Sequence, residues 1–318
     1  MKRYLILSVV ALSYQSVWAQ GLLQESFGSG ANQFTMDFVT IGNPGNAADT
    51  TGSPNPVGSV AYTYNLGKYE VSRDMITKAN SAGSLGITMS DMSSFGGNGL
   101  LKPATGVSWY EAAKFVNWLN TSTGNTAAYK FDESGTFQLW SAGDAGYNAN
   151  NMFRNSLAKY VIASRDEWYK GAYGKADGSW SNFPNGSDSA PRSVASGTDP
   201  NTAVYAQSYE AGPADVFSAG GLSAYGTMGQ GGNAWEWMET AYWGFNNIAN
   251  SIEDGIREGR GGAWYTYSDS LHPSFTIGSY ATSESNDNGF RVASVPEPSS
   301  FSLLAIGLGG LALVRRRK

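Results

Sequence analysis

The sequence of 318 residues has no cysteine and only one histidine, His272. Without thiols the chain can form no disulfide bond, and it lacks the soft ligands that copper prefers. A lone histidine, here followed by Pro273, has no second histidine with which to build a metal site, so a structural role is the simpler interpretation. A serine nucleophile would need a lysine base, and the sequence singles out no such pair. The G-x-S-x-G elbow and the phosphate-binding glycine loop are also missing.

Charged residues are scarce as well, at 15% of the sequence, whereas the chain has 40 glycines and 13% aromatic residues. This composition predicts a loop-rich fold with an aromatic core. Loss of the six basic residues at the two chain ends would reduce the 21 basic residues to 15, against 26 acidic ones, and leave a net charge near −11. We therefore expect no nucleic-acid partner.

The N-terminal end predicts export. Lys2 and Arg3 precede an apolar stretch, and the small residue Ala19 follows it, so residues 1–19 form a signal peptide that signal peptidase would remove. Between the two chain ends, residues 20–294 show no internal repeat and are long enough for one domain with its own core.

The C-terminal end, residues 295–318, joins a Pro-Glu-Pro turn to a short apolar segment and a basic cluster. The apolar segment, residues 301–314, would extend roughly 21 Å as a helix, which is short for a bilayer span. Its basic end would stay at the cytoplasmic face. These features alone leave two alternatives open, a sorting signal that is cleaved after transient membrane contact and a plain membrane anchor.

In detail this end resembles the bacterial PEP-CTERM sorting signal. The motif residues are Pro296, Glu297 and Pro298, followed by a glycine-containing apolar segment and an arginine-rich terminus. The resemblance implies an exosortase-type processing enzyme as a partner, and export to the cell envelope or extracellular matrix of a Gram-negative bacterium.

Local patterns predict short strands and long loops. Residues 33–41 alternate as a strand, and residues 60–71 predict a second strand that precedes a short helix over 72–80. Residues 178–231 are rich in Ser, Gly, Asn and Pro and predict long ordered loops, which are commonly functional in a compact domain. The sum is an α+β domain with low secondary-structure content.

Two further helices carry clear start signals. Ser108 with Glu111, and Ser164 with Glu167, form S-x-x-E capping boxes. Both acids are most simply cap residues that satisfy the first free N–H groups of their helices.

Five segments in order resemble the formylglycine-generating enzyme family, also called the sulfatase-modifying factor domain. They are "GKYEVSRDMI" (67–76), "PATGVSWYEAAKFVNWLN" (103–120), "SRDEWYKGAYG" (164–174), "GGNAWEWMET" (231–240), and "GRGGAW" with "NGFRVAS" (259–264, 288–294). The resemblance covers nearly all of the mature chain. It implies a variant of the C-type lectin fold.

The fourth segment places Glu236 between Trp235 and Trp237 after a glycine-rich turn. In the family this segment binds calcium, so the resemblance implies a ligand set of the Glu236 carboxylate with the carbonyls of Gly232 and Ala234. Hard oxygen ligands on a flexible turn suit Ca²⁺. On a strand the two indoles would share the core face while the acid faces the ion. The alternative is a surface glutamate on a buried strand.

Two departures from the family pattern limit what the resemblance implies. Gly229 stands where the family has an Asn or Asp ligand, and a second family calcium site has only Asn201 and Asp215 as rough candidates. The catalytic members bind Cu(I) through two cysteines, and those positions hold Thr266 and Leu271. No copper is therefore expected, and the sequence favours a protein that is not an enzyme.

Arg260 and Arg291 lie in motifs shared with non-catalytic members and are expected to be structural, each paired with an acid or with carbonyls. The leading interpretation is a non-catalytic, calcium-stabilised protein that binds a glycan or peptide. Aromatic residues in glycine-rich loops, at 241–247 and 263–269, would present flat rings to such a ligand. Two alternatives stay open, namely a sulfatase-activating oxidase and a purely structural matrix component.

Overall fold

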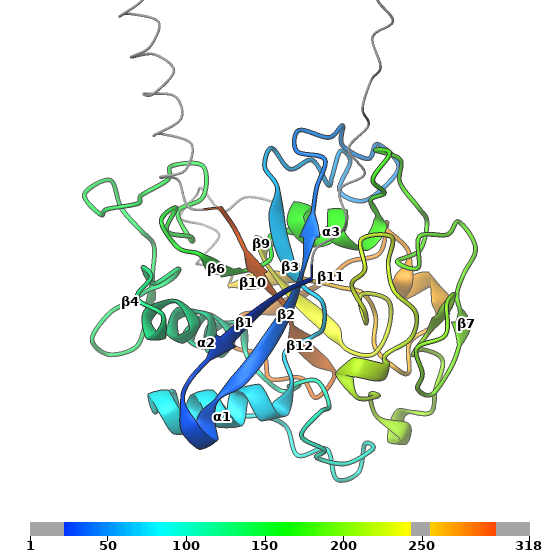
Figure 1. The fold of residues 1–318 in the computed structure, drawn as a ribbon, viewed down its shortest axis with the longest axis horizontal. Helices are drawn as coiled ribbons and strands as arrows, with labels where there is room; N and C mark the ends of the chain where they lie inside the picture. Colours follow the sequence, from blue (N-terminus) through cyan, green and yellow to red (C-terminus); the bar gives the residue numbers. More distant parts are fainter. Residues whose placement is uncertain (1–21, 243–254, 297–318) are drawn as a thin grey trace, which may run out of the picture.

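The computed structural model describes residues 22–242 and 255–296. The predicted signal peptide, most of the 241–247 loop, and Glu297 and Pro298 of the sorting motif lie outside these residues. Figure 1 shows the strands near the centre, with two helices on the left and long loops on the right. None of the helices in the described residues is long and apolar enough to cross a membrane.

A five-stranded antiparallel sheet joins the two ends of the domain. Its order is β1–β2–β3–β13–β6, and its strands are Leu22–Phe27 (β1), Phe34–Ile41 (β2), Tyr64–Gly67 (β3), Tyr160–Ile162 (β6) and Val292–Ser294 (β13). Strand β13 pairs with both β3 and β6. The C-terminal strand of the domain is therefore held inside the sheet.

A second sheet has the order β11–β10–β9–β12, with strands Trp235–Ala241 (β9), Ile256–Arg260 (β10), Ile277–Tyr280 (β11) and Asn288–Phe290 (β12). Strand β9 is antiparallel to β10 and parallel to β12. A single residue, Arg291, separates β12 from β13, so the chain crosses from one sheet to the other at this position.

The α-helices begin at the serines that the sequence predicts. They are Arg73–Gly83 (α1), Trp109–Ser122 (α2) and Arg165–Tyr173 (α3). The Ser72 side chain accepts a hydrogen bond from the Met75 N–H, and both predicted capping boxes are complete. Helix α2 packs against β6, and α3 packs against β3 and β9. The helix start signals are thus confirmed.

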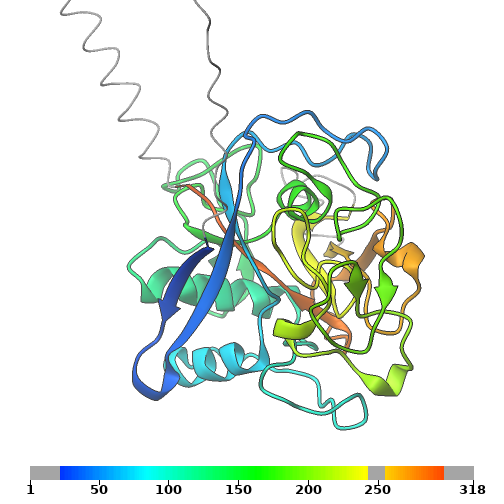
Figure 2. The ribbon, with the colours of Figure 1, turned by 45° about the vertical axis from the view of Figure 1, so that its right-hand side comes forward.

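The predicted loop region is confirmed as well. Between α3 and β9 the chain forms only β7 (Arg192–Ser193), β8 (Thr202–Ala203) and the 3-10 helices η2 (Tyr209–Ala211) and η3 (Val216–Ser218). These loops make up one side of the molecule and adjoin the orange η4 segment (Figure 2). The other short elements are η1 (Gly30–Asn32), β4 (Lys130–Phe131), β5 (Phe137–Gln138) and η4 (Ser268–Leu271).

The expected strands differ in extent from the prediction. Strand β2 matches its predicted range, but the second strand spans only Tyr64–Gly67 within the predicted residues 60–71. Strand β1 was not predicted, because most of its side chains, including the apolar Leu22 and Leu23, stay exposed and give no buried-face pattern.

Buried apolar side chains form two clusters. The larger one includes Trp109, Trp168 and Trp237, and the smaller one, beneath the loops, includes Trp235 and Trp264. Trp235 and Trp237 are both buried on β9, and each belongs to a different cluster. Trp235, the first residue of β9, packs into the smaller cluster and stacks on Phe275 at 5.8 Å.

Candidate functional site

Glu236, the acid between two tryptophans, is fully buried and forms an ion pair, so it is not a surface residue. Arg291 Nη2 lies 2.7 Å from Glu236 Oε1, and Arg291 Nε lies 3.0 Å from Oε2. The indole N–H of Trp168 donates to Oε2 at 2.7 Å. Bidentate pairs of this kind are among the stronger hydrogen-bonded contacts in proteins. Removing one partner of a buried pair leaves a charge without compensation.

Arg291 also holds neighbouring segments together. Its Nη1 and Nη2 groups each donate at 2.7 Å to a backbone carbonyl, that of Gly67 at the end of β3 and that of Met228 in the loop before β9. Because Arg291 sits where the chain crosses between the sheets, its guanidinium ties both sheets and the adjoining loop. This geometry fits the structural role expected from the sequence.

A second buried carboxylate, Glu70, lies beside this pair. It accepts hydrogen bonds from Asn233 Nδ2 at 2.6 Å and from the Ala234 N–H at 3.2 Å. Burial and the nearby Glu236 charge raise the pKa of Glu70 to about 8, although Arg291 acts against them. Glu70 is a neighbour that sequence reasoning missed, since nothing local connects it to residues some 160 positions away.

Glu70 also accounts for the glycine at position 229. A Cβ added to Gly229 would lie 3.1 Å from Glu70 Oε2, so the carboxylate fills the space into which a side chain there would extend. The positive φ of Gly229, 79°, favours glycine independently.

The residues around Glu236 do not fit a calcium ion held by its carboxylate. Both oxygens are bonded to Arg291, and one also accepts from Trp168. An ion there would meet the positive guanidinium at close range. The described residues contain no group of three or more His, Cys, Asp or Glu side chains that could hold a metal.

Asn201 and Asp215, the other calcium candidates, lie in segments that the fold brings together. Backbone bridges join Gly197 to Ala219 and Ala203 to Gly220. The half-buried Asp215 side chain makes no cap hydrogen bond to η3 and has no side-chain partner among the described residues. Asn201 is exposed, with a φ of 57° and an amide contact to Asn185 at 3.4 Å. In ligand chemistry this pair of oxygen donors suits calcium.

Thr266 and Leu271, which the resemblance places where the copper cysteines would be, have structural surroundings in this chain. The Thr266 hydroxyl donates to Ala263 O at 2.9 Å and accepts from the Ala263 N–H at 3.1 Å, so it closes the turn before η4. Leu271 is completely buried. Neither side chain offers a soft ligand for copper.

Arg260 is likewise buried and paired. Its Nε lies 2.5 Å from Glu258 Oε1, and its Nη1 donates to Pro273 O at 3.0 Å. Glu258 also accepts from Arg165 at the start of α3. The guanidinium therefore fixes the chain beyond η4 against β10 and has no face open to a substrate.

Close to the Thr266 turn lies a group of rings that we call the aromatic surface, made of Phe95, Tyr209, Trp264, Tyr265 and Tyr267. Tyr209 stacks on Trp264 at a centroid distance of 5.8 Å, and Phe95 and Tyr265 each meet Tyr209 edge-on at 4.8 Å. Tyr267 is 78% exposed and Tyr209 is 39% exposed. Phe95, Tyr209, Trp264 and Tyr265 are thus packed by one another, while Tyr209 is partly exposed and Tyr267 is largely exposed.

The backbone and a polar rim fix this surface in place. Ala206 N donates to Thr266 O at 2.8 Å and Gln207 N to Trp264 O at 2.9 Å, which joins the two loops. At the rim the Tyr209 hydroxyl donates to Asn286 Oδ1 at 2.8 Å. Rings held in this way lose little conformational freedom when a ligand binds.

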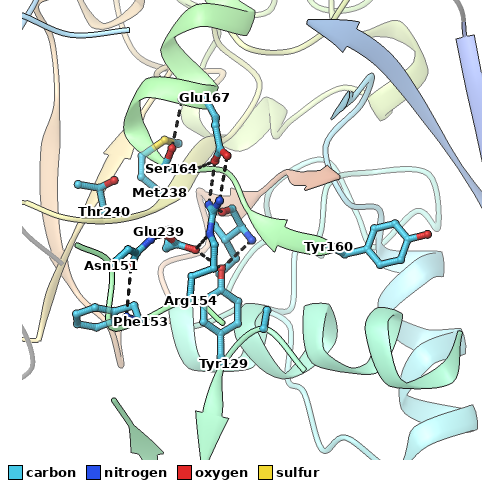
Figure 3. A network of polar contacts seen from close by, with 12 residues as sticks. Tyr129, Asn151, Phe153, Arg154, Tyr160, Ser164, Glu167, Met238, Glu239 and Thr240 are labelled. Atoms are coloured by element: carbon cyan, nitrogen blue, oxygen red, sulfur yellow. Dashed lines mark hydrogen bonds and ion pairs between the residues drawn. The ribbon is translucent and has the colours of Figure 1, made fainter. Parts of the chain in front are cut away.

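A separate polar network surrounds Arg154 (Figure 3). Its guanidinium lies between Glu167, at 2.9 and 3.0 Å, and Glu239, at 2.7 Å. Glu239 also accepts from the Tyr129 hydroxyl at 2.8 Å and from Asn151 Nδ2 at 2.6 Å. The interpretation of Glu167 as a cap residue is confirmed but incomplete, since the same carboxylate binds Arg154. Arg154 lies 85 residues from Glu239, so no local pattern signals the contact.

Comparisons with known proteins agree with this architecture. Similar solved structures include Treponema denticola variable protein 1 (17% identity, 86% of this chain and 99% of that chain, TM-score 0.58) and CarF (17%, 82% and 98%, TM-score 0.57). PvdO from Pseudomonas aeruginosa is similar as well (18%, 86% and 98%, TM-score 0.54). At these identities the likeness shows the fold alone, and it confirms the expected loop-rich, C-type-lectin-like class. No curated protein matches the chain.

Sequence families give the remaining evidence. Residues 294–318 match the PEP-CTERM protein-sorting motif, which indicates export and sorting to the bacterial cell envelope and implies processing by exosortase-type machinery. Residues 33–295, nearly the whole described domain, match the sulfatase-modifying factor enzyme 1-like domain. The chain therefore belongs to the sulfatase-modifying factor enzyme 1-like family and ends in a PEP-CTERM sorting motif.

Proposed function

We propose that this protein is a non-catalytic binding domain that presents its aromatic surface to a glycan or a peptide outside the cytoplasm. The observation that carries the proposal is the rigid cluster of rings beside positions 266 and 271. Tyr209 and Tyr267 are exposed there, and the neighbouring loops are joined by backbone hydrogen bonds. Flat rings favour the C–H faces of sugars and the apolar side chains of peptides.

The proposal disfavours the oxidase alternative for a chemical reason. Copper-dependent oxidation in the catalytic members needs two thiolates, and this chain has no cysteine at all. The hydroxyl at Thr266 closes a turn, and Leu271 is buried, so neither residue replaces a thiolate.

A purely structural matrix role is the remaining alternative. It requires no specific ligand, so it predicts no selectivity among glycans or peptides. The exposed rings favour the binding proposal, because one of them is 78% exposed and a matrix domain gains no stability from that exposure.

Sorting and calcium complete the proposal. We place the processed protein in the envelope or matrix of a Gram-negative bacterium, after cleavage at Ala19 and beyond Pro298. The intact mass of envelope-derived protein measures both cleavages, and a mass that retains residues 301–318 would favour a permanent anchor. Calcium is proposed at the Asn201 and Asp215 loops, since Glu236 is committed to Arg291.

A glycan and peptide array probed with the protein purified from the envelope tests the binding proposal. We expect selective binding that is lost in a Tyr209→Ala/Tyr267→Ala variant. The matched control is Tyr280→Ala, which removes a ring that is 63% exposed on β11 but lies outside the aromatic surface. Absence of selective binding, or equal loss in the Tyr280→Ala variant, would contradict the proposal.

A further inference from the structure

A cavity of about 370 Å³ opens next to the Arg154 network, away from the residues of the aromatic surface. Its wall includes the side chains of Asn148, Asn151 and Asn155, and of Ser156. Val295 and Pro296, the last described residues of the chain, also line it. Its volume is near the lower end of the range for small-molecule pockets, which is about 300 to 1,000 Å³. It has room for a molecule the size of one sugar ring.

Arg154 is the only charged residue that lines the cavity, and it forms ion pairs with two buried acids, Glu167 and Glu239. Burial alone would raise the pKa of Glu167, but Arg154 and the hydrogen bonds to this carboxylate lower it to about 2, so Glu167 is ionised at neutral pH. Arg154 lies between Glu167 and Glu239, and only 11% of its side chain is exposed. Among the residues that line the cavity none is acidic, and the charge of Arg154 is already compensated by Glu167 and Glu239. A charged ligand would therefore find no free ion-pair partner in the lining, which favours a neutral ligand.

Some polar groups of the wall are hydrogen-bonded within the protein, and others are not. Asn151 and Asn155 each use both their amide oxygen and their amide nitrogen in hydrogen bonds within the protein, which fixes the wall. The Ser156 hydroxyl and the Asn148 Nδ2 group have no hydrogen-bond partner among the described residues. These two groups remain available to a ligand, one as a donor and acceptor and the other as a donor.

The rest of the lining includes less polar surface. Val295 is anchored by the bond from its N–H to Lys159 O at 2.8 Å, and Pro296 follows it at the cavity. The Tyr62 ring also lines the cavity, while its hydroxyl donates to Glu167 Oε1 at 2.5 Å. A lining that combines polar groups with aliphatic and aromatic surface suits a ring that carries both hydroxyl groups and C–H groups.

We infer that this cavity is a second binding site, specific for a neutral polyhydroxylated molecule of about the size of a monosaccharide. The inference goes beyond the proposed function and is independent of it, because none of its residues belongs to the aromatic surface. Since Pro296 begins the sorting motif, a bound sugar would contact the chain just before the segment that is processed.

Titration calorimetry with protein purified from the envelope tests this inference. Glucose and N-acetylglucosamine serve as neutral probes, and glucuronate and glucosamine as their anionic and cationic counterparts. We expect saturable binding of at least one neutral probe and about tenfold weaker binding of the charged ones. An Asn148→Ala/Ser156→Ala variant should bind the neutral probe about tenfold more weakly, because two hydrogen bonds are lost.

The control variant is Tyr209→Ala/Tyr267→Ala, which should bind the neutral probe as the wild type does. If the Asn148→Ala/Ser156→Ala protein melts at a lower temperature, Ser156→Ala alone removes one free hydroxyl and takes its place. The inference is overturned if no neutral probe binds, if the charged probes bind equally well, or if only the aromatic variant loses binding.

Discussion

The surroundings of Glu236 and the turn at Thr266 are two regions that the family resemblance links to metal ions, and they have diverged differently. At Glu236 the acidic residue is present, yet its carboxylate serves a buried arginine that joins two sheets. At Thr266 and Leu271 the residues themselves have changed, while the backbone turn persists through a threonine hydroxyl. The comparison teaches that one region is held by a buried ion pair between two sheets and the other by a turn that a threonine hydroxyl closes.

The largest expected effect on stability comes from removing the buried ion pair between Glu236 and Arg291. Arg291→Met should lower the free energy of unfolding by about 3 to 5 kcal/mol, because Glu236 would remain buried without its partner. Urea denaturation of the variant and of the Tyr280→Ala control measures the difference. A loss below about 1 kcal/mol would mean that the pair does not hold the sheets together.

The second prediction concerns the effect of calcium on stability, and it distinguishes Glu236 from the Asn201 and Asp215 loops. If the ion binds at the Asn201 and Asp215 loops, it should contribute about 2.7 kcal/mol at a hundredfold excess over Kd, so EDTA should lower the melting temperature by several degrees. Asp215→Asn should abolish the response to EDTA, whereas Glu236→Gln should retain it. The nearby acid Glu239 would not serve as a control position, because its side chain is buried in an ion pair with Arg154.

Two outcomes would contradict this assignment. If Glu236→Gln loses the response to EDTA and Asp215→Asn keeps it, calcium binds at Glu236. Equal melting temperatures with calcium and with EDTA in the wild type would remove calcium from the account altogether.

The pH dependence of stability gives a smaller effect. Because the folded-state pKa of Glu70 is raised from 4.5 to about 8, the folded protein keeps a proton that the unfolded chain releases. The stabilisation from this group is complete below pH 4.5 and is lost as the pH rises toward 8, at up to about 1.4 kcal/mol per pH unit. Glu70→Gln cannot ionise, so its unfolding free energy should vary less over this window. Identical pH profiles for wild type and variant would refute the assignment.

Much of the fold could be predicted from the sequence where the determinants are local. The caps at Ser72, Ser108 and Ser164 involve residues three positions apart, and all three helices begin where predicted. The contacts of the candidate site are not local. Glu236 and Arg291 are 55 residues apart, and the partner of Glu70 is 163 residues away. The local sequence of a glutamate between two tryptophans is the same whether its carboxylate binds a metal ion or a guanidinium. Only the fold therefore distinguishes an ion site from an ion pair.

The most direct test of the central claim, a conserved fold without oxidase chemistry, is a copper and turnover assay. Purified protein is titrated with Cu(I) and incubated under oxygen with a sulfatase-derived cysteine peptide, and mass spectrometry follows the peptide. With no thiolate at positions 266 and 271, we predict no tight copper binding and no conversion of the cysteine to formylglycine. Stoichiometric copper binding with turnover of the peptide would contradict the account.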